Sequence, residues 1–284
     1  MRLLCRVLKV ARSSFYDWMA DRKPMSKVGN ASLSVHVRAI HRRSRGTYGS
    51  PRIHAELKSE GHRVGRHRVA RLMREMGLSG TPKRRFRVRT THSKHAMPAA
   101  ENVLQRDFHV PNQKAGVPNR VWVGDITYLS TAAGFVYLSV LLDLYSRKVV
   151  GWSLASHMHT ELCMNALNQA ITTRSPGPGL LHHSDRGSQY TSGAYQGALA
   201  AISARPSMSR KGDCWDNAVA ESFFGTLEQE LVRSSPRWAD EEEARKAVGD
   251  YIHSFYNAQR RHSTLGYLSP VDFELRHHTS ARAA

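Results

Sequence analysis

The chain has 284 residues, of which 40% are hydrophobic and 23% charged, as is typical of a folded protein and not of a disordered or fibrous one. It carries 42 Lys and Arg against 23 Asp and Glu, a formal net charge of +19. All of this excess lies in residues 1–100, which hold 24 basic and 5 acidic side chains, whereas residues 101–284 hold 18 of each. This asymmetry indicates an N-terminal part that binds a polyanion and a neutral remainder with a different role.

The sequence argues against membrane, secreted and zinc-finger proteins. Its longest apolar run, residues 135–142, is far shorter than the roughly 20 residues that a membrane span needs. Basic residues interrupt the apolar ones at the N-terminus, so a signal-peptide core is missing there. The three cysteines are scattered and lack paired spacing, which favours reduced thiols in a cytoplasmic protein.

The first third of the chain is expected to be helical. Residues 1–30 have the spacing of two short helices, and Lys23-Pro24 ends that unit. In residues 31–80 we expect one helix running to about Arg43, a second that begins at Pro51, and a third that Gly77 ends. The apolar residues of the third helix recur at i, i+3, i+4 and i+7: Val69, Leu72, Met73 and Met76.

Basic side chains lie opposite the apolar stripe of this third helix: Arg66, Arg68, Arg71 and Arg74. This pattern fits a helix-turn-helix that lays its second helix in the major groove of DNA, although a solvated face of an ordinary bundle has the same composition. The linker at 81–117 favours DNA because it carries five cations within seven residues, which repel one another unless phosphates neutralise them. These cations are Lys83, Arg84, Arg85, Arg87 and Arg89. Such an arm follows a DNA backbone or enters a minor groove.

From residue 118 the pattern changes to a mixed α/β fold. Strands are expected at 121–129, 135–142 and 148–154, joined by turns short enough for an antiparallel meander. A helix at 160–172, a strand at 180–183, a helix from about 192 and a strand within 202–208 follow. Helices at 217–232 and 240–256 complete a mixed sheet that is covered by helices.

Three acidic residues in this part are candidates for chemistry. Asp125 lies inside an apolar strand, where a half-buried carboxylate is costly without a partner. Asp185 follows a short apolar strand, the position at which α/β sheets build their sites. Glu221 borders the apolar stripe of a helix that Asn217 is expected to cap. Taken singly, each has an ordinary alternative: an exposed edge-strand acid, a turn Asp and a first-turn acid favoured by the helix dipole.

The order and spacing of these acids resemble a known family. Residues 122–128 fit W-x-x-D-I-T-Y, residues 183–190 fit H-S-D-x-G-x-Q-Y and residues 216–224 fit D-N-A-x-x-E-S-F-F, with 35 residues between Asp185 and Glu221. The segment 256–270, together with Gly46-Thr47-Tyr48-Gly49, extends the match over nearly the whole chain. The sequence thus resembles the OrfB-type (second reading frame) transposases of the bacterial insertion-sequence-three family, which are akin to retroviral integrases.

The resemblance implies a ribonuclease-H-like catalytic core over 118–284, an integrase-associated helix-turn-helix over 31–80, and Asp125, Asp185 and Glu221 as a D-D-E triad. Such carboxylates bind Mg²⁺ or Mn²⁺, and two ions activate an attacking oxygen and stabilise the departing one. Water is expected to free a 3′-OH at the element end, and that hydroxyl then attacks another phosphodiester. A catalytically inactive DNA-binding regulator is the alternative, and a plain metal-dependent nuclease is a third interpretation.

Other positions have a weaker link to function. His183 and Gln189 flank Asp185 and orient water or phosphate if they do not serve in packing. Arg260 and His262 contact DNA or else close the domain. Glu228 departs from the family, because most relatives carry Lys or Arg seven residues after the catalytic Glu. A carboxylate there repels phosphate, so either a neighbour such as Arg233 or Lys211 takes over the cationic role or the activity is weakened.

The resemblance also implies the partners. Double-stranded DNA is expected in two roles, as the terminal repeats of the element and as the target. Pairing of two element ends implies a homo-oligomer, at least a dimer, in the bacterial cytoplasm with the nucleoid. The chain has no leucine heptads at its start, so an upstream-frame transposase protein, or a frameshift fusion with it, is expected to contribute specificity and assembly.

Overall fold

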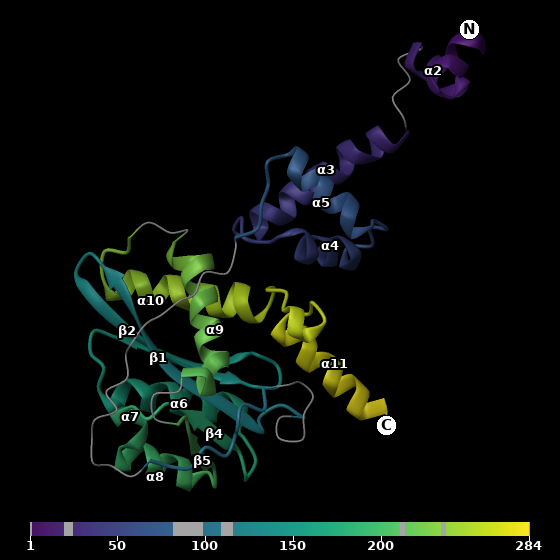
Figure 1. Ribbon diagram of the computed structural model, residues 1–284. Coiled ribbons are helices and arrows are strands. Elements are labelled where there is room, and N and C mark those ends of the chain that lie inside the picture. The colour runs from purple at the N-terminus through teal and green to yellow at the C-terminus, as the bar shows by residue number, and fades with distance from the viewer. Residues whose placement is uncertain are drawn as a thin grey trace. The chain divides into compact units, whose positions relative to one another are not determined.

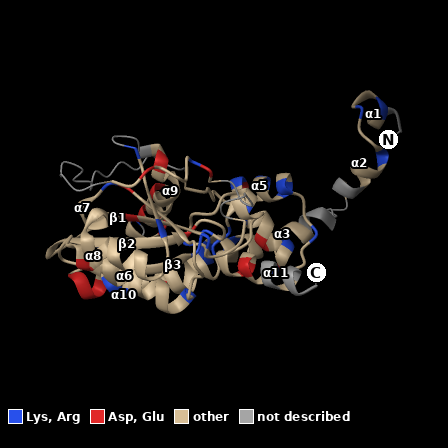
Figure 2. Ribbon diagram, turned by 90° about the horizontal axis from the view of Figure 1, so that it is seen from below, with Lys and Arg blue, Asp and Glu red and all other residues tan. Residues whose placement is uncertain are grey.

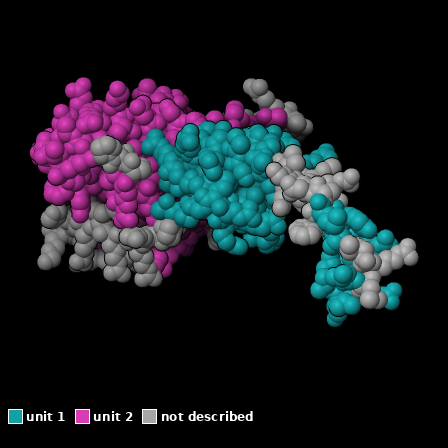
Figure 3. All heavy atoms as spheres, turned by 90° about the horizontal axis from the view of Figure 1, so that it is seen from above, with its two compact units in different colours: residues 1–81 teal, residues 82–284 magenta. Residues whose placement is uncertain are grey.

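The computed structural model describes residues 2–19, 25–81, 99–108, 116–210, 214–233 and 237–283. The chain divides into two compact units, residues 1–81 and residues 82–284 (Figure 3). The cationic arm from Lys83 to Arg89 lies outside the described residues. Within the described ranges, no helix combines the length and apolar character that crossing a membrane requires.

The N-terminal unit is helical, as the spacing of its apolar residues predicts. Its helices are α1 (Arg2–Val7), α2 (Arg12–Met19), α3 (Met25–Arg43), α4 (Ser50–Ser59) and α5 (Arg66–Glu75). Helix α3 begins directly after Pro24 and runs without a break across the boundary expected at residue 30. The apolar stripes of α3, α4 and α5 meet in a core that includes Val37, Ile53, Leu57 and Val69. Gly77, at φ +66°, follows the end of α5 in the left-handed conformation that glycine adopts easily.

A mixed five-stranded sheet forms the centre of the second unit, which confirms the expected mixed α/β class (Figure 1). Its strands are β1 (Val121–Thr131), β2 (Gly134–Asp143), β3 (Val149–Ala155), β4 (Leu181–Ser184) and β5 (Arg205–Met208). They lie in the order β3-β2-β1-β4-β5. The meander β1-β2-β3 is antiparallel, whereas β4 and β5 add to β1 in parallel.

Helices and helical turns follow the strands. They are α6 (Thr160–Arg174), α7 (Ser188–Thr191), α8 (Gly193–Ala201), η1 (Cys214–Asn217), α9 (Ala218–Leu227), η2 (Glu228–Val232), α10 (Glu241–Asp250), η3 (Tyr251–Asn257), η4 (Ser263–Leu265) and α11 (Pro270–Ala283). The two long helices expected at 217–232 and 240–256 each change to a π-helical turn, at η2 and η3. Helix α11 lies within the C-terminal part of 118–284, for which a helical segment is expected, although the sequence pattern does not give its bounds.

Alternation along β1 assigns its side chains to two faces of the sheet. Trp122 and Ile126 join the main apolar core, to which α6, α7 and α8 also contribute. Val123 and Asp125 alternate with these two residues and therefore point to the opposite face. Gly151 of β3 lets α6 lie close to the sheet, because a Cβ there would meet the Ala166 carbonyl oxygen at 2.1 Å.

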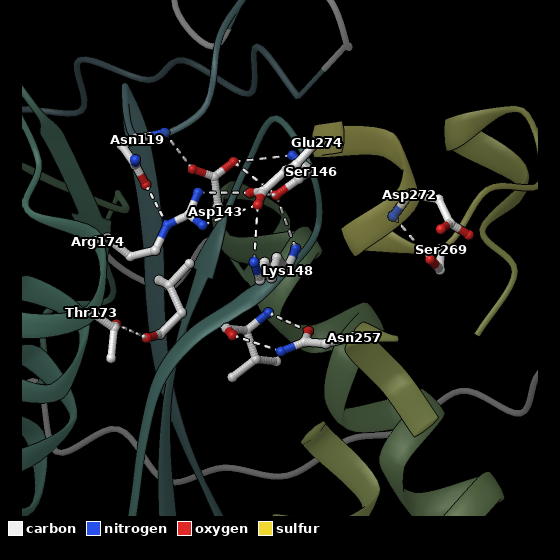
Figure 4. Close-up of polar contacts among 12 residues, drawn as sticks. Asn119, Asp143, Ser146, Lys148, Thr173, Arg174, Asn257, Ser269, Asp272 and Glu274 are labelled. Atoms are coloured by element: carbon white, nitrogen blue, oxygen red, sulfur yellow. Dashed lines mark hydrogen bonds and ion pairs between the residues drawn. The ribbon is translucent and has the colours of Figure 1, made fainter. Parts of the chain in front are cut away.

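A buried polar network joins α11 to the sheet (Figure 4). Glu274, which is 5% exposed, receives two hydrogen bonds from the Arg174 guanidinium at 2.7 and 3.0 Å and one from Lys148 Nζ at 3.0 Å. Ser146 Oγ donates to it at 2.8 Å, and Asp143 accepts from the Ser146 amide. The network therefore ties the C-terminal helix to the end of β2, the start of β3 and the end of α6.

Replacing Glu274 is expected to destabilise the second unit. In Glu274→Gln the Lys148 and Arg174 cations lose a buried counter-charge, a loss that costs about 3–5 kcal/mol. Burial acts to raise the pKa of the Glu274 carboxyl, but Arg174 and Lys148 outweigh it and hold that pKa below its usual range. The stabilisation by Glu274 is thus fully present above the pKa of an ordinary carboxyl and is lost as pH falls through the lowered pKa of the folded state. The difference in free energy of unfolding between Glu274→Gln and the wild type therefore becomes smaller in acid.

Urea unfolding monitored between pH 3 and pH 7 measures this effect. Asp272→Asn is the matched control, since Asp272 is an exposed carboxylate on the same helix. Equal free energies of unfolding for Glu274→Gln and Asp272→Asn at pH 7 contradict the assigned role of the network.

Candidate active site

Parallel pairing of β1 and β4 brings Asp125 and Asp185 to neighbouring positions. Trp122 pairs with His182 and Val123 pairs with His183. Continuing the register by two residues places Asp125 beside Asp185, just beyond the carboxyl end of β4. Neighbouring strands lie about 4.8 Å apart, so the two side chains share one face at one edge of the parallel segment.

The electrostatics show that these carboxylates lie near a third one. Burial raises the pKa of the Asp125 carboxyl well above its usual range, and the charges of Asp185 and Glu221 raise it further. Burial also raises the pKa of Glu221. Backbone amides stabilise the two aspartates, because Ile126 N donates to Asp125 Oδ1 at 2.8 Å and Gly187 N donates to Asp185 Oδ1 at 2.9 Å. The structure thus brings Asp185 and Glu221 each within electrostatic range of Asp125.

Helix α9 carries Glu221 and packs against β1. Its residues Ala220, Phe223, Phe224 and Leu227 are buried, as the apolar stripe predicts. Asn217 stands at the N-cap position but forms no side-chain cap, which corrects the role expected from the sequence. Its Nδ2 instead donates to the Gly124 carbonyl at 3.2 Å. This bond fixes the start of α9 beside the residue that precedes Asp125.

The donor set at this edge suits a hard divalent cation. In the part of the chain that the structure describes, no three His, Cys, Asp or Glu side chains converge into a complete metal-ligating group. All three acids nevertheless offer oxygen ligands, and their mutual repulsion is of the kind that a bound cation relieves. Asn217 Oδ1 is buried and accepts no hydrogen bond, so it leaves an unsatisfied oxygen at the start of the Glu221 helix. The chemistry of these groups therefore fits Mg²⁺ or Mn²⁺.

The carboxylate of Asp216 joins several segments of the chain, a role that the sequence did not reveal. Its fully buried carboxylate accepts from Asn102 Nδ2 at 2.8 Å, from Arg106 Nε at 2.6 Å and from the amide and guanidinium of Arg210 at 2.9–3.0 Å. It thereby ties the segment 99–108 and the end of β5 to the start of α9. The only sequence signal for this role is an Asp directly before the N-terminus of the helix that carries Glu221.

His183 and Gln189 both have structural partners. His183 is buried between Ser207 Oγ and the Asp216 carbonyl, each 2.9 Å from a ring nitrogen. Burial lowers the pKa of His183 to about 4, so the ring is neutral near pH 7. Gln189 Nε2 donates to the Met158 carbonyl at 2.8 Å. These contacts favour the packing alternative over orientation of water or phosphate.

Arg260 and His262 are also buried, at 4% and 8% exposure. Arg260 Nε donates to both carboxylate oxygens of Glu230 at 2.7 and 3.0 Å, and Tyr251 OH donates to the same carboxylate at 2.9 Å. The rings of His262 and Tyr256 pack in a T-shaped arrangement, with their centroids 5.0 Å apart. The structure thus places both residues in the packing that closes the domain, and not at a surface open to DNA.

Glu228, the departure from the family pattern, has a nearby cation. Arg233 Nε lies 3.2 Å from Glu228 Oε1, across the π-helical turn η2. Arg233 is one of the two neighbours expected to take over the cationic role, and it lies beside the Glu228 carboxylate. Lys211 lies outside the described residues.

Helix α5 carries several basic residues, drawn blue in Figure 2. They fall into two groups by exposure. Arg66, Arg71 and Arg74 are exposed, and Arg71 forms an exposed pair with Glu75 at 3.7 Å. Arg68 is half-buried, and its Nε donates to Asn30 Oδ1 of α3 at 2.9 Å. Arg68 therefore joins two helices of the bundle, whereas the other three arginines face solvent.

Known protein families match both parts of the chain. Residues 29–86 match an HTH-like domain, and residues 116–214 and 203–270 match the integrase core domain. An uncharacterized 31 kDa protein of insertion element IS600 from Shigella sonnei is 41% identical over 278 residues, 98% of this chain and 100% of that protein. The transposase InsF for insertion sequence IS3A from Escherichia coli strain K12 is 40% identical over 278 residues, 96% of this chain and 93% of that protein.

These matches define the class as a protein that joins an HTH-like domain to an integrase core. Because the identity extends over nearly the full length of both relatives, the chain belongs to the family of insertion-sequence transposases that includes InsF of IS3. Among solved structures, a chain of the simian T-cell lymphotropic virus intasome in complex with PP2A regulatory subunit B56 gamma has a TM-score of 0.49 at 16% identity, covering 84% of this chain and 74% of that chain.

Neutralising Asp125 is expected to stabilise the metal-free protein. The raised pKa of Asp125 means that the native state favours the protonated form, so the wild type loses stability as pH rises through that pKa. Asp125→Asn removes this charge, and in the presence of a chelator its Tm should exceed that of the wild type by about 2–4 °C near pH 7, the shift that roughly 1 kcal/mol produces.

Thermal unfolding in chelator at pH 5 and pH 8 measures the difference, which should be larger at pH 8. Asp250→Asn serves as the control, because Asp250 is an exposed carboxylate on α10. A lower Tm for Asp125→Asn than for Asp250→Asn at pH 8 contradicts the expected repulsion among the three acids.

Proposed function

We propose that this protein is a DNA transposase that cleaves the ends of an insertion element and transfers the freed 3′-OH strand to another phosphodiester. Asp125, Asp185 and Glu221 are its catalytic residues. One observation carries the proposal: three acids that lie far apart in sequence come within electrostatic range at the carboxyl edge of β4. The membership in the transposase family supports the same activity.

The three carboxylates would hold two divalent ions, either Mg²⁺ or Mn²⁺. When bound, such ions lower the pKa of an attacking water or hydroxyl and stabilise the charge of the departing oxygen. Asp125 and Asp185 bind from adjacent strands, whereas Glu221 approaches from α9, whose start Asn217 fixes against Gly124. Because backbone amides already hold both aspartates, their oxygens are oriented before a metal or DNA arrives.

The basic first third of the chain would hold double-stranded DNA. Arg66, Arg71 and Arg74 face solvent on α5, and the cationic arm from Lys83 to Arg89 follows that unit in sequence. Since phosphate contacts give affinity and positioning, this part would bind the terminal repeats while the integrase core acts on the strand ends. Synapsis of two ends requires a homo-oligomer, at least a dimer, and an upstream-frame protein or fusion would add specificity.

Removing any one of the three carboxylates should abolish strand joining. Asp125→Asn, Asp185→Asn and Glu221→Gln keep the size of the side chain but remove a charged oxygen ligand, and we expect joining of labelled element-end oligonucleotides to fall at least 100-fold. The assay runs over a Mg²⁺ titration, with and without the upstream-frame protein.

Glu242→Gln provides the matched control, because Glu242 is an exposed carboxylate on α10. Undiminished joining by any triad variant removes that residue from the catalytic set. A wild-type protein that binds element ends at every Mg²⁺ concentration but never nicks them is a regulator, and one that nicks without joining is a nuclease.

The exposed arginines of α5 should control DNA affinity. Arg66→Ala and Arg74→Ala are each expected to weaken duplex binding at 0.1 M salt and to reduce the slope of log affinity against log salt by about 1, since each contact to phosphate releases about one counterion. Fluorescence anisotropy at several salt concentrations measures both quantities. Lys246→Ala, which removes an exposed cation from α10, should leave the slope unchanged. Equal slopes for all three variants contradict a role for α5 in binding.

A further inference from the structure

Helices α1 and α2 form a helical hairpin that lies outside the matched HTH-like domain. The match to that domain begins at residue 29, whereas α2 ends at Met19. Residues 8–11 join the two helices. Two helices joined by about three or four residues are the helix-turn-helix motif, which lays its second helix in the major groove of DNA. The short connection therefore makes α2 a candidate for a helix that contacts DNA.

The turn of this hairpin has a defined geometry. The Val10 amide donates to the Cys5 carbonyl at 2.9 Å, and Cys5 itself is buried, at 5% exposure. The Lys9 amide donates to the Arg6 carbonyl at 3.3 Å, and Lys9 has φ +52°. These two bonds and the left-handed residue form a Schellman motif, which ends α1 and changes the direction of the chain. Backbone hydrogen bonds thus set the direction in which α2 leaves α1.

The outward face of α2 carries side chains that can recognise base pairs. Arg12, Ser13 and Tyr16 are exposed, Tyr16 at 48%. Their spacing places all three on one side of the helix, at its N-terminal end. In a helix-turn-helix these are the positions that contact base edges. An Arg side chain pairs with both acceptors of a guanine in the major groove, and hydroxyl groups donate to or accept from several bases.

The charge of the hairpin has the sign that DNA attracts. Residues 2–19 contain four basic residues and one acidic residue, a balance of +3. Arg6 and Lys9 are exposed on α1 and its turn, and Arg12 is exposed at the start of α2. Within the part of the chain that the structure describes, the side chains of these three residues form no ion pair. Their cations are therefore available to phosphates.

A protein partner is the competing occupant of the hairpin. Leu4, Val7 and Leu8 are 56–73% exposed on α1 and directly after it, and apolar side chains in solvent often mark protein contacts. The centre of a protein interface is, however, depleted of charged residues, whereas cations occur along this whole hairpin. The outward face of α2 also ends in guanidinium and hydroxyl groups. The observations thus favour DNA.

We propose that α1 and α2 form a second helix-turn-helix, in which α2 recognises base pairs of the element end separately from α5. Arg12, Ser13 and Tyr16 contact the base edges, and Arg6 attracts the phosphate backbone. The inference rests on the proposed function, which supplies the DNA. It adds a second site of recognition, so that the chain contacts two separate segments of the element end.

A series of element-end duplexes, each with one substituted base pair, tests this site in the full-length chain. Fluorescence anisotropy in 0.1 M salt and chelator, which prevents cleavage, gives the ratio of affinities for the parent and the substituted duplex. At base pairs that Arg12 contacts, the wild type should show a ratio of about 5 to 150, which corresponds to 1–3 kcal/mol. Arg12→Ala should lower that ratio to about 1, because alanine keeps the helix but removes the donors.

Two variants serve as comparisons. Lys9→Gly removes a cation from the same hairpin and keeps the left-handed turn, so it should retain the wild-type ratios. Arg71→Ala, on the exposed face of α5, should not affect the base pairs that depend on Arg12.

Three results overturn the inference. In the first, Arg12→Ala keeps the wild-type ratio at every base pair, as a hairpin that docks a protein would. In the second, it weakens binding to all duplexes equally, which is a phosphate contact alone. In the third, Lys9→Gly or Arg71→Ala loses the same ratios as Arg12→Ala. Failure of the catalytic proposal has a separate signature, which is joining by the triad variants.

Discussion

Repulsion between carboxylates held side by side is the constraint on which the candidate active site depends. Continued by two residues, the parallel register that pairs Val123 of β1 with His183 of β4 places Asp125 beside Asp185. Burial makes the charge of Asp125 costly, and the nearby Asp185 and Glu221 add to that cost. The backbone amides of Ile126 and Gly187 donate hydrogen bonds to the two aspartates and offset part of this cost. Function and stability thus oppose each other at this edge of the sheet.

Buried polar anchors hold the elements that surround these acids. Asp216 joins two separate segments to the start of α9, and Asn217 joins that start to β1. On the far side of the helix, the buried pair of Arg260 and Glu230 joins the segment after η3 to η2. Because Glu221 lies between these anchors, contacts that other residues make fix its position.

The sequence predicted the strands of the meander, the basic face of α5 and the order of the three acids, since each depends on local periodicity or on a motif. It did not predict the roles of Asp216 or Asn217, and it left two alternatives for Arg260, a DNA contact or packing that closes the domain. An Asp or Asn before a helix has the composition of an ordinary cap, and only the folded chain shows that the Asn217 amide reaches Gly124, 93 residues away. For Arg260, its burial against Glu230 favours packing over a DNA contact. Long-range polar pairing leaves no trace in local patterns, which is why these assignments required the structure.

The Glu274 network also constrains how the chain is made. Lys148 and Arg174 precede their shared carboxylate by 126 and 100 residues. At a synthesis rate of about 5–20 residues per second, these cations leave the ribosome roughly 5–25 s before Glu274 does. Until then the junction of β2, β3 and α6 holds two cations without their acidic partner. The second unit consequently reaches its final stability only after Glu274 has been synthesised, so a polypeptide interrupted before α11 lacks the carboxylate that pairs with Lys148 and Arg174.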